Sequence, residues 1–284
     1  EATGNEALWT NSMFSGMPAY QISTRSNANL MQYVVKVITL GMPRPASYLF
    51  LYLLGFYILL LSLKVDYRLS AVGAIAFAFS SYFFIIIEAG HMTKAHAIAY
   101  VPMVVAAVLY TYRGKILLGG ALTSLTVALE IYANHLQITY YLLLLLILIG
   151  MVQFFKDFKA NNLFDFSKRT CVLLLAALLA SGTAFTNLAT TMEYGQDSTR
   201  GKSDLTSNLE NKTAGLDKDY ATSWSYGVAE TFTLLIPNFY GGASQGELTT
   251  DSETFQAIKR APNAKQLIKQ LPLYWGDQPF TSGP

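Results

Sequence analysis

Six apolar runs follow one another in the middle of this 284-residue chain, and they restrict its fold more than any other feature. Most of them approach the roughly 20 residues that an α-helix needs to cross a bilayer. Almost no charged residue interrupts them, so buried helices of a large soluble protein explain them less well. The sequence therefore predicts an all-α polytopic membrane protein with six transmembrane helices, near residues 46–63, 69–87, 96–112, 116–131, 137–155 and 170–189.

Composition supports this fold class. Only 13% of the residues are charged, against roughly a quarter in a typical soluble domain. The formal net charge of +2 offers no polybasic surface, so a nucleic-acid partner is not expected. The single cysteine, Cys171, lies inside an apolar run and cannot form an intramolecular disulfide. The lipid bilayer is therefore the one partner that composition indicates.

Lysine and arginine residues in the short loops predict the orientation. Eight of them fall in one set of loops, namely Lys64, Arg68, Arg113, Lys115, Lys156, Lys159, Lys168 and Arg169. The opposite loops hold only Lys94 between residues 88 and 136. Because cytoplasmic loops carry the excess of positive residues, we expect residues 64–68, 113–115 and 156–169 to be cytoplasmic. Residues 1–45 and 190–284 are then extracytoplasmic, on either side of a transmembrane region, 46–189.

The N-terminal outer segment contains a candidate interfacial helix. Residues 28–42 place Leu30, Val34, Val37 and Ile38 near one helical face, and two prolines, Pro43 and Pro45, end the pattern. Such a helix can lie in the membrane interface and lead into the first transmembrane helix. A buried helix of an outer domain is the alternative.

The C-terminal outer segment is less regular. Residues 190–220 are polar and favour a long loop. The stretch VAETFTLLIP, residues 228–237, is too apolar for a free loop. We expect it to form a short helix that ends at Pro237 and buries Phe232, Leu235 and Ile236 against the transmembrane helices or the interface. Two short helical patterns follow within residues 252–271, separated at Pro262 and stopped at Pro272.

Ionisable side chains gather in two stretches that lie between apolar runs. The first, IIIEAGHMTKAHAIAY (85–100), contains Glu88, His91, Lys94 and His96. The second, ALEIYANHLQITYY (128–141), contains Glu130, Asn134, His135 and Gln137. An ionisable group at membrane depth is costly unless it has a partner or a function. We therefore expect both stretches near the outer membrane boundary, in a shared cavity partly closed by residues 224–241.

Several kinds of site are compatible with these residues. Glu88 and His91 have the Glu-x-x-His spacing of di-iron proteins, but Glu130 and His135 lie five residues apart, on different helical faces, so no metal is indicated. A proton or ion pathway can use the same groups, although no predicted transmembrane helix carries a charge at its middle, where transporters bind. Alternatively, the residues only mark where helices leave the bilayer.

A site for a lipid-linked substrate fits the placement of these residues best. A polyprenyl phosphate needs cations at headgroup depth, and an attacking hydroxyl needs a carboxylate that accepts its proton. We assign the catalytic carboxylates to Glu88 and Glu130. Substrate binding is assigned to His91, Lys94 and His96 for the phosphate, to Asn134 and Gln137, with His135 between them, for the sugar hydroxyls, and to Trp224, Tyr226 and Tyr240 for stacking on the sugar. The interfacial helix would border the entry route of the lipid tail.

Five stretches together resemble the YfhO family of bacterial membrane proteins, in the form found in Bacteroidetes: LWTNSMFSGMPAYQ, EAGHMTKAHAIAYVP, ALEIYANHLQITYY, LLIPNFYGG and YWGDQPFTSGP. That family is similar to the GT-C superfamily of polytopic glycosyltransferases, which use polyprenyl-phosphate sugars on the outer side of the membrane. The resemblance implies a location in the bacterial inner (cytoplasmic) membrane. It also implies that the chain is a piece of a longer protein, with an acidic residue of the first outer loop ahead of Glu1 and further helices after Pro284.

The predicted function is transfer of a sugar from a polyprenyl-phosphate donor to a cell-envelope acceptor on the outer face of the membrane, and no cofactor is indicated. A non-catalytic membrane protein, either a transporter or an assembly partner, is the alternative. The arrangement in space distinguishes them. Polar clusters that converge beneath residues 224–241 and open sideways to lipid favour the transferase, whereas a continuous pore favours transport.

Overall fold

The computed structural model describes residues 9–12, 16–19, 29–195, 218–242 and 248–276 of the chain. The chain divides into two compact units, and each has its own packing. The first unit comprises Glu1–Ala78 and Met92–Ser198, and the second comprises Phe79–His91 and Thr199–Pro284.

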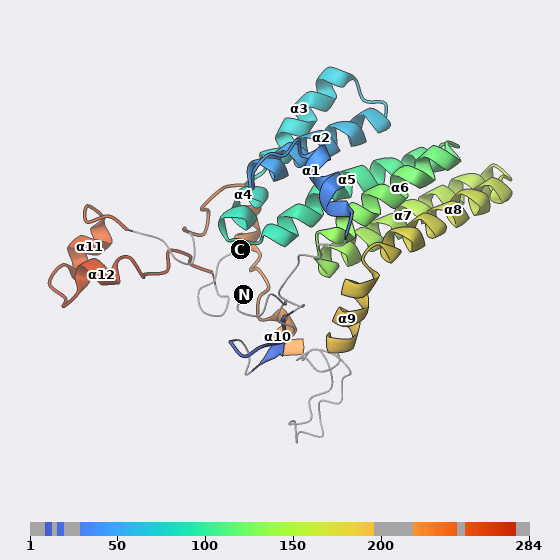
Figure 1. Ribbon diagram of the computed structural model, residues 1–284. Helices are drawn as coiled ribbons and strands as arrows, with labels where there is room; N and C mark the ends of the chain where they lie inside the picture. Colours follow the sequence, from blue (N-terminus) through green and yellow to red (C-terminus); the bar gives the residue numbers. More distant parts are fainter. Residues whose placement is uncertain (1–8, 13–15, 20–28, 196–217, 243–247, 277–284) are drawn as a thin grey trace. The chain divides into compact units, whose positions relative to one another are not determined.

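Helices make up nearly all the regular structure of the first unit (Figure 1). A two-residue antiparallel pair, β1 (Trp9–Thr10) and β2 (Met17–Pro18), places Trp9 opposite Pro18. The helices are α1 (Met31–Ile38), α2 (Ala46–Ser62), α3 (Tyr67–Ala78), α5 (Met92–Tyr112), α6 (Ile116–Tyr132), α7 (Leu136–Lys159), α8 (Leu163–Gly182) and α9 (Phe185–Gly195).

Helix α5 lies at the centre of the first unit. It packs against α2, α6, α7 and α8, and most of its side chains are buried. A helix that is apolar all round is expected to be surrounded in this way. Its buried valines Val104, Val105 and Val108 pack with Tyr112 and with Leu142 of α7. Figure 1 shows α5, α6, α7 and α8 side by side, so they form one bundle.

The second unit consists of short elements. They are α4 (Ser81–Glu88), α10 (Lys218–Thr222), the 3₁₀ helix η2 (Ala229–Leu234), α11 (Glu253–Ile258) and α12 (Ala264–Leu267). Helix α4 packs against η2, and a single antiparallel bridge joins Gly241 to Tyr274. Helices α11 and α12 lie where the sequence predicts two short helices around Pro262, and this prediction is confirmed.

The apolar helices indicate a multi-pass membrane protein. Among the described residues, three helical stretches are long and apolar enough to cross a membrane, namely Tyr67–Glu88, Met92–Tyr112 and Leu136–Lys159. The bent pair formed by α8 and α9 meets the same criterion when the two helices are counted as one stretch. Helices α2 and α6 are apolar but shorter, at 17 residues each. The mostly helical fold is thus confirmed, and the number of six crossings stays a prediction.

Two of the predicted transmembrane helices are interrupted. The run predicted at 69–87 breaks between α3 and α4, where Ser80 adopts an extended conformation and is followed by a second serine, Ser81. The run predicted at 170–189 bends by 79° between α8 and α9, just after Ser181 and Gly182. Serine and glycine pairs are frequent sites of helix kinks, since serine hydroxyls compete for backbone hydrogen bonds and glycine is permissive.

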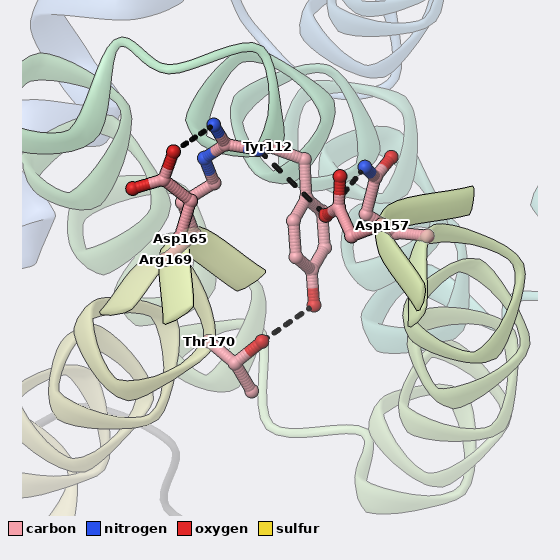
Figure 2. Close-up of polar contacts among 6 residues, drawn as sticks. Tyr112, Asp157, Asp165, Arg169 and Thr170 are labelled. Carbon is pink, nitrogen blue, oxygen red and sulfur yellow. Dashed lines mark hydrogen bonds and ion pairs between the residues drawn. The ribbon is translucent and has the colours of Figure 1, made fainter. Parts of the chain in front are cut away.

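The loop predicted at 156–169 is mostly helical. Helix α7 continues to Lys159 and α8 begins at Leu163, so only three residues connect them. The sequence assigns Arg169 to a loop because it is charged, but the side chain is mostly buried between two carboxylates (Figure 2). Its guanidinium nitrogens lie 3.7 Å from Asp157 and 3.6 Å from Asp165. The amide of Gln153 donates to Asp157 at 2.9 Å, so the helix can continue past these charges.

Helix α1 has the exposed apolar stripe that an interfacial helix needs. It is shorter than the predicted 28–42, because regular hydrogen bonding is confined to Met31–Ile38. Leu30, Tyr33, Val37 and Leu40 are each at least 60% exposed, and their spacing places them along one face. Val34 and Ile38 are half-buried, on the side where α1 contacts α6. Whether the stripe lies in the membrane interface stays a prediction.

The predicted short helix at VAETFTLLIP is present as η2, but its packing differs from the prediction. Phe232, Leu235 and Ile236 are 51%, 74% and 47% exposed, so they are not buried against protein. The buried side chains of this helix are those of Glu230 and Thr233. The reason is that the Glu230 carboxylate has hydrogen-bond partners within the second unit, namely Gly227 and Tyr274. The face of η2 that carries Glu230 and Thr233 is therefore buried, and the apolar face is exposed. Burial of the three apolar side chains in the interface stays a prediction. The predicted loop 190–220 lies mostly outside the described residues.

The first prediction concerns orientation. Cysteines introduced as Lys115→Cys and Ala160→Cys, in a Cys171→Ser background, should resist an impermeant maleimide in intact spheroplasts and react after permeabilisation, because positively charged loops stay in the cytoplasm. A control cysteine, Gln137→Cys at the exposed start of α7, should react in intact spheroplasts. Labelling of Lys115→Cys from outside would overturn the orientation.

The second prediction concerns the approach of α6 to α5. A Cβ added at Gly119 would lie 2.8 Å from the backbone Cα of Thr111, so Gly119→Ala should force the helices apart. Overpacking of this kind costs about 1–3 kcal/mol, and we expect a lower thermal unfolding midpoint in detergent. Gly182→Ala is the matched control, since nothing lies within 4 Å of its added Cβ. Equal midpoints for the two variants would contradict the close packing.

Candidate functional site

The residues predicted to form one site fall into both units. Lys94, His96, Glu130, Asn134, His135 and Gln137 belong to the first unit. Glu88, His91, Trp224, Tyr226 and Tyr240 belong to the second. A cavity shared by Glu88 or His91 with Glu130 or His135, closed by residues 224–241, therefore stays a prediction. Within each unit, the geometry of the side chains can be described directly.

In the first unit, His96 lies in a row of aromatic side chains. The histidine is buried, and its Nε2 lies 3.1 Å from the hydroxyl of Tyr100 one turn along α5. On its other side, the ring of Tyr48 lies 5.3 Å away between centroids. The guanidinium of Arg44 lies 5.9 Å above the Tyr48 ring, within the distance of a cation–π contact. The row thus runs from an exposed cation to a buried imidazole and phenol.

This row forms because α2 and α5 approach closely. On α5, the residues beside His96 are small, and Ala95, Ala97 and Ala99 are fully buried. On α2, a Cβ at Gly55 would lie 3.1 Å from the Ala99 carbonyl oxygen, so glycine allows the contact. The hydroxyl of Tyr52 donates to the Ala95 carbonyl at 2.8 Å. That hydrogen bond fixes α2 against the turn of α5 that carries His96.

Glu130 is fully buried at the end of α6. The hydroxyl of Thr139 lies 3.1 Å and 3.0 Å from its two carboxylate oxygens and donates to them. These residues meet because the chain reverses between α6 and α7, where Asn134 adopts a positive φ of 57° that asparagine tolerates. Within the described ranges, no cation lies within ion-pair distance of this carboxylate. A hydroxyl is therefore its main support.

The two ionisable stretches meet in the first unit through apolar contacts. Ala97 of α5, Ala133 of the α6–α7 turn and Ile138 of α7 form a buried cluster with Ile98 and Val101. This cluster brings the segment that contains His96 beside the turn that contains Asn134 and His135. Both of these turn residues are half-buried, as is Lys94. The structure thus gathers the first-unit members of the predicted site at one end of the bundle.

Other members of the predicted site are exposed. Gln137 donates its amide to the hydroxyl of Tyr141 at 2.7 Å on the surface of α7. Glu88 and His91 are exposed at and just beyond the end of α4. Trp224 is 47% exposed, whereas Tyr226 and Tyr240 are half-buried. The exposed residues remain accessible to a ligand, but no described side-chain contact holds the carboxylate of Glu88 or the imidazole of His91 in place.

The second unit contains a buried carboxylate that the sequence analysis missed. Glu230 is 3% exposed, and it accepts hydrogen bonds from the backbone N–H of Gly227 and the hydroxyl of Tyr274. Burial and the neighbouring Glu230 carboxylate raise the pKa of Tyr274. Burial and the nearby Tyr82 and Glu230 also raise the pKa of Tyr226. The sequence does single out this carboxylate, since Glu230 is the only charged residue between residues 220 and 246.

Sequence reasoning also missed the partners of the predicted residues. Arg44 stands between two prolines, and Tyr48 and Tyr100 belong to apolar runs, so nothing in the local pattern singles them out. Thr139 resembles an ordinary helix residue. These side chains become important only because helices far apart in the sequence meet, and a pattern within one helix does not report such contacts.

An apolar groove of about 390 Å³ lies in the first unit. It is bounded by α1, α2, α5 and α6, and its lining includes Ile38, Leu54, Met103, Leu122 and Leu129. The lining of α6 extends from Leu118 to Leu129, which corresponds to about 16 Å at 1.5 Å per residue. The groove therefore follows the helix axes, and on α6 it ends one residue before Glu130.

No group of three or more metal-binding side chains occurs in the part of the chain that the structure describes. The buried side chains of His96, Glu130 and Glu230 are instead joined to their neighbours by hydrogen bonds and aromatic contacts. No protein-family model, no curated protein and no solved structure matches this chain. The geometry of the two units and the sequence patterns are thus the basis for a functional proposal.

The third prediction concerns the support of Glu130. Thr139→Val removes the hydroxyl that donates to the buried carboxylate, and leaving a buried polar group without a partner costs about 1–3 kcal/mol. The thermal unfolding midpoint in detergent should fall, whereas Thr139→Ser should retain it. Thr190→Val is the matched control, because that hydroxyl donates to carbonyls of its own helix. No difference between the two valine variants would show that Glu130 does not depend on Thr139.

Proposed function

We propose that this protein transfers a sugar from a polyprenyl-phosphate donor to a hydroxyl of a cell-envelope acceptor, on the outer face of a bacterial cytoplasmic membrane. The acceptor oxygen bonds to the anomeric carbon of the sugar, and the bond from that carbon to the phosphate oxygen breaks. The proton of the acceptor hydroxyl passes to a carboxylate, and polyprenyl phosphate leaves. The resemblance to the YfhO family and the GT-C superfamily is one support for this proposal.

The observation that carries the proposal is the apolar groove beside the candidate interfacial helix. Ile38 of α1 lines it together with residues of α2, α5 and α6. A lipid-linked donor needs a place for its hydrocarbon chain that leads to the polar site, and this groove ends next to the segment that contains Glu130. A groove lined by apolar side chains is a poor path for ions, so it favours a lipid-linked substrate over a conducting pore.

The first unit offers groups for the phosphate and the sugar. We assign the phosphate to Lys94 and to Arg44, which the sequence analysis missed and which is exposed at the open end of the aromatic row. Because His96 is buried against Tyr100, we assign it to positioning this row rather than to direct contact. Asn134, His135 and Gln137 remain candidates for hydrogen bonds to sugar hydroxyls. Glu130 is one of two candidate bases.

The second unit offers the other candidate base and aromatic surfaces. Glu88 is exposed and can therefore reach a substrate hydroxyl, with His91 nearby in sequence to contact the phosphate. Trp224 is about half exposed, as a ring that stacks on a sugar should be. Tyr226 and Tyr240 present less surface. We therefore expect Trp224 to contribute most to stacking.

A proton-coupled transporter is the second candidate, and Glu130 favours it. A fully buried carboxylate near the end of an apolar helix, supported by a hydroxyl and no described cation, is the kind of group that carries protons in transporters. In proteoliposomes, a transporter would acidify the lumen under a substrate gradient, and Glu130→Gln would abolish the signal. A transferase would cause no acidification, whether the unaltered protein or the Glu130→Gln variant is reconstituted.

The fourth prediction concerns catalysis. Glu88→Gln and Glu130→Gln should be tested with a radiolabelled polyprenyl-phosphate sugar and membranes that contain acceptor. Loss of the acid–base group typically slows a reaction about 10²–10⁴-fold, so one of the two variants should fall by this amount. Lys94→Ala should weaken donor binding and raise KM more than it lowers kcat, because the ammonium attracts the phosphate before and during reaction.

The matched control is Glu253→Gln, which removes an exposed carboxylate from α11. It should retain full transfer. All variants should first be shown to insert and to unfold at the same temperature as the unaltered chain. Full sugar transfer by all of the Glu88, Glu130 and Lys94 variants would contradict the assignment of these residues to the site.

A further inference from the structure

The segment around η2 is almost free of charge. Between residues 220 and 246, Glu230 is the only charged residue. The segment is rich in apolar and aromatic residues, and its apolar run, residues 228–237, is too short to cross a bilayer. Its character therefore differs from that of an ordinary outer loop, which would carry several charged residues.

The apolar side chains of this segment point away from the second unit's own core. Val228 is 90% exposed and Leu235 is 74% exposed. Phe232, Ile236 and Phe239 are each about half exposed, and the rings of Phe232 and Phe239 lie 5.5 Å apart between centroids. Large apolar patches of this kind mark sites of contact with membranes or proteins.

The one charge in the segment is removed from this surface. The Glu230 carboxylate faces inward, where Gly227 and Tyr274 donate hydrogen bonds to it. Part of the backbone is also satisfied locally, since the Phe232 carbonyl accepts from both Leu235 and Ile236 and the Ile236 carbonyl accepts from Phe239. A segment that enters lipid needs both features, because unpaired charges and backbone groups are costly there.

Contacts with α4 indicate how deep the segment lies. Helix α4 belongs to the candidate membrane-crossing stretch Tyr67–Glu88 and packs against η2. The hydroxyl of Ser81, at the start of α4, donates to the Leu235 carbonyl at 3.4 Å. Ser81 and Glu88 are seven residues apart, which is about 10 Å along a helix. Leu235 therefore lies up to about 10 Å from the exposed, charged end of α4, toward its apolar part.

We propose that residues 228–239 form a membrane-inserting element that lies beside α4 in the leaflet next to Glu88, with lipid acyl chains as its partner. The inferred depth matches the roughly 5–10 Å by which interfacial helices are buried in a bilayer. Trp224 and Trp275, which are 47% and 79% exposed, are the residue type that lies at the headgroup level. Continuity with α4 is the reason for choosing lipid over a second protein. This proposal does not depend on the transferase function.

The fifth prediction tests this insertion. A fluorophore that is sensitive to polarity should be attached to Leu235→Cys, in a Cys171→Ser background, and the full chain should be reconstituted in phosphatidylcholine nanodiscs. Its emission should shift to the blue, and lipids with a spin label on the acyl chain should quench it at least twofold more than a soluble quencher does. The same probe on Val228→Cys should behave alike, because that side chain is also exposed on the segment.

Ala257→Cys provides the matched control, because Ala257 is an exposed residue of the polar helix α11 in the same unit. Its probe should be quenched by the soluble reagent and little by the lipids. Leu235→Asp should reduce insertion and increase quenching of the Val228→Cys probe by the soluble reagent. If both segment probes respond like Ala257→Cys, the element does not enter the bilayer. If they are protected from both quenchers, a protein covers the patch and the proposal is also wrong.

Discussion

Helix α5 can occupy the centre of the first unit only because its neighbours approach it closely. Inside a membrane, helices gain little from the hydrophobic effect, since lipid tails are as apolar as leucine, and they associate through close packing. Gly55 of α2 lies against the Ala99 carbonyl, and Gly119 of α6 lies against the backbone of Thr111. The alanines around His96 serve the same purpose. Larger side chains at these positions would separate the helices. The polar residues on neighbouring helices would then no longer be in contact.

Close packing in turn determines which polar groups can be buried. Several hydroxyls bond to carbonyls of their own helix, as Thr111 does to Ala107 and Thr126 does to Leu122. Charged or titratable groups need partners from elsewhere, because an unpaired one would be far more costly. Glu130 finds such a partner on the next helix. At the opposite end of the bundle, Asp157 of α7 finds Arg169 of α8 (Figure 2).

The sequence predicted the helices better than their contacts. Each predicted run is helical over most of its length, as a membrane-crossing segment must be to satisfy its backbone, although two of the runs are interrupted. The break at Ser80 and the helical position of Arg169 were missed. Two adjacent serines lower the hydropathy of a run too little to indicate a break, and a charged residue such as arginine was assigned to a loop because of its charge alone. The candidate site was anticipated as two polar stretches. The burial of Glu130 and the exposure of Glu88 could not be anticipated, because they depend on which helix faces which.

The first unit has few cations near the candidate site residues, and this limits how strongly a lipid-linked donor would be held. Moving a hydrocarbon tail from the bilayer into an apolar groove exchanges one apolar environment for another, so it adds little binding energy. The groove can position the tail, but it cannot select it strongly. Affinity would then come from the polar end, which has two nearby cations. Arg44 contacts the Tyr48 ring of the aromatic row, and Lys94 precedes His96 by two residues on α5. Their attraction for a phosphate is strongest where water is scarce. Arg44 is exposed and Lys94 is half-buried, so these two cations would hold a donor more tightly if its own sugar and lipid chain excluded water from them.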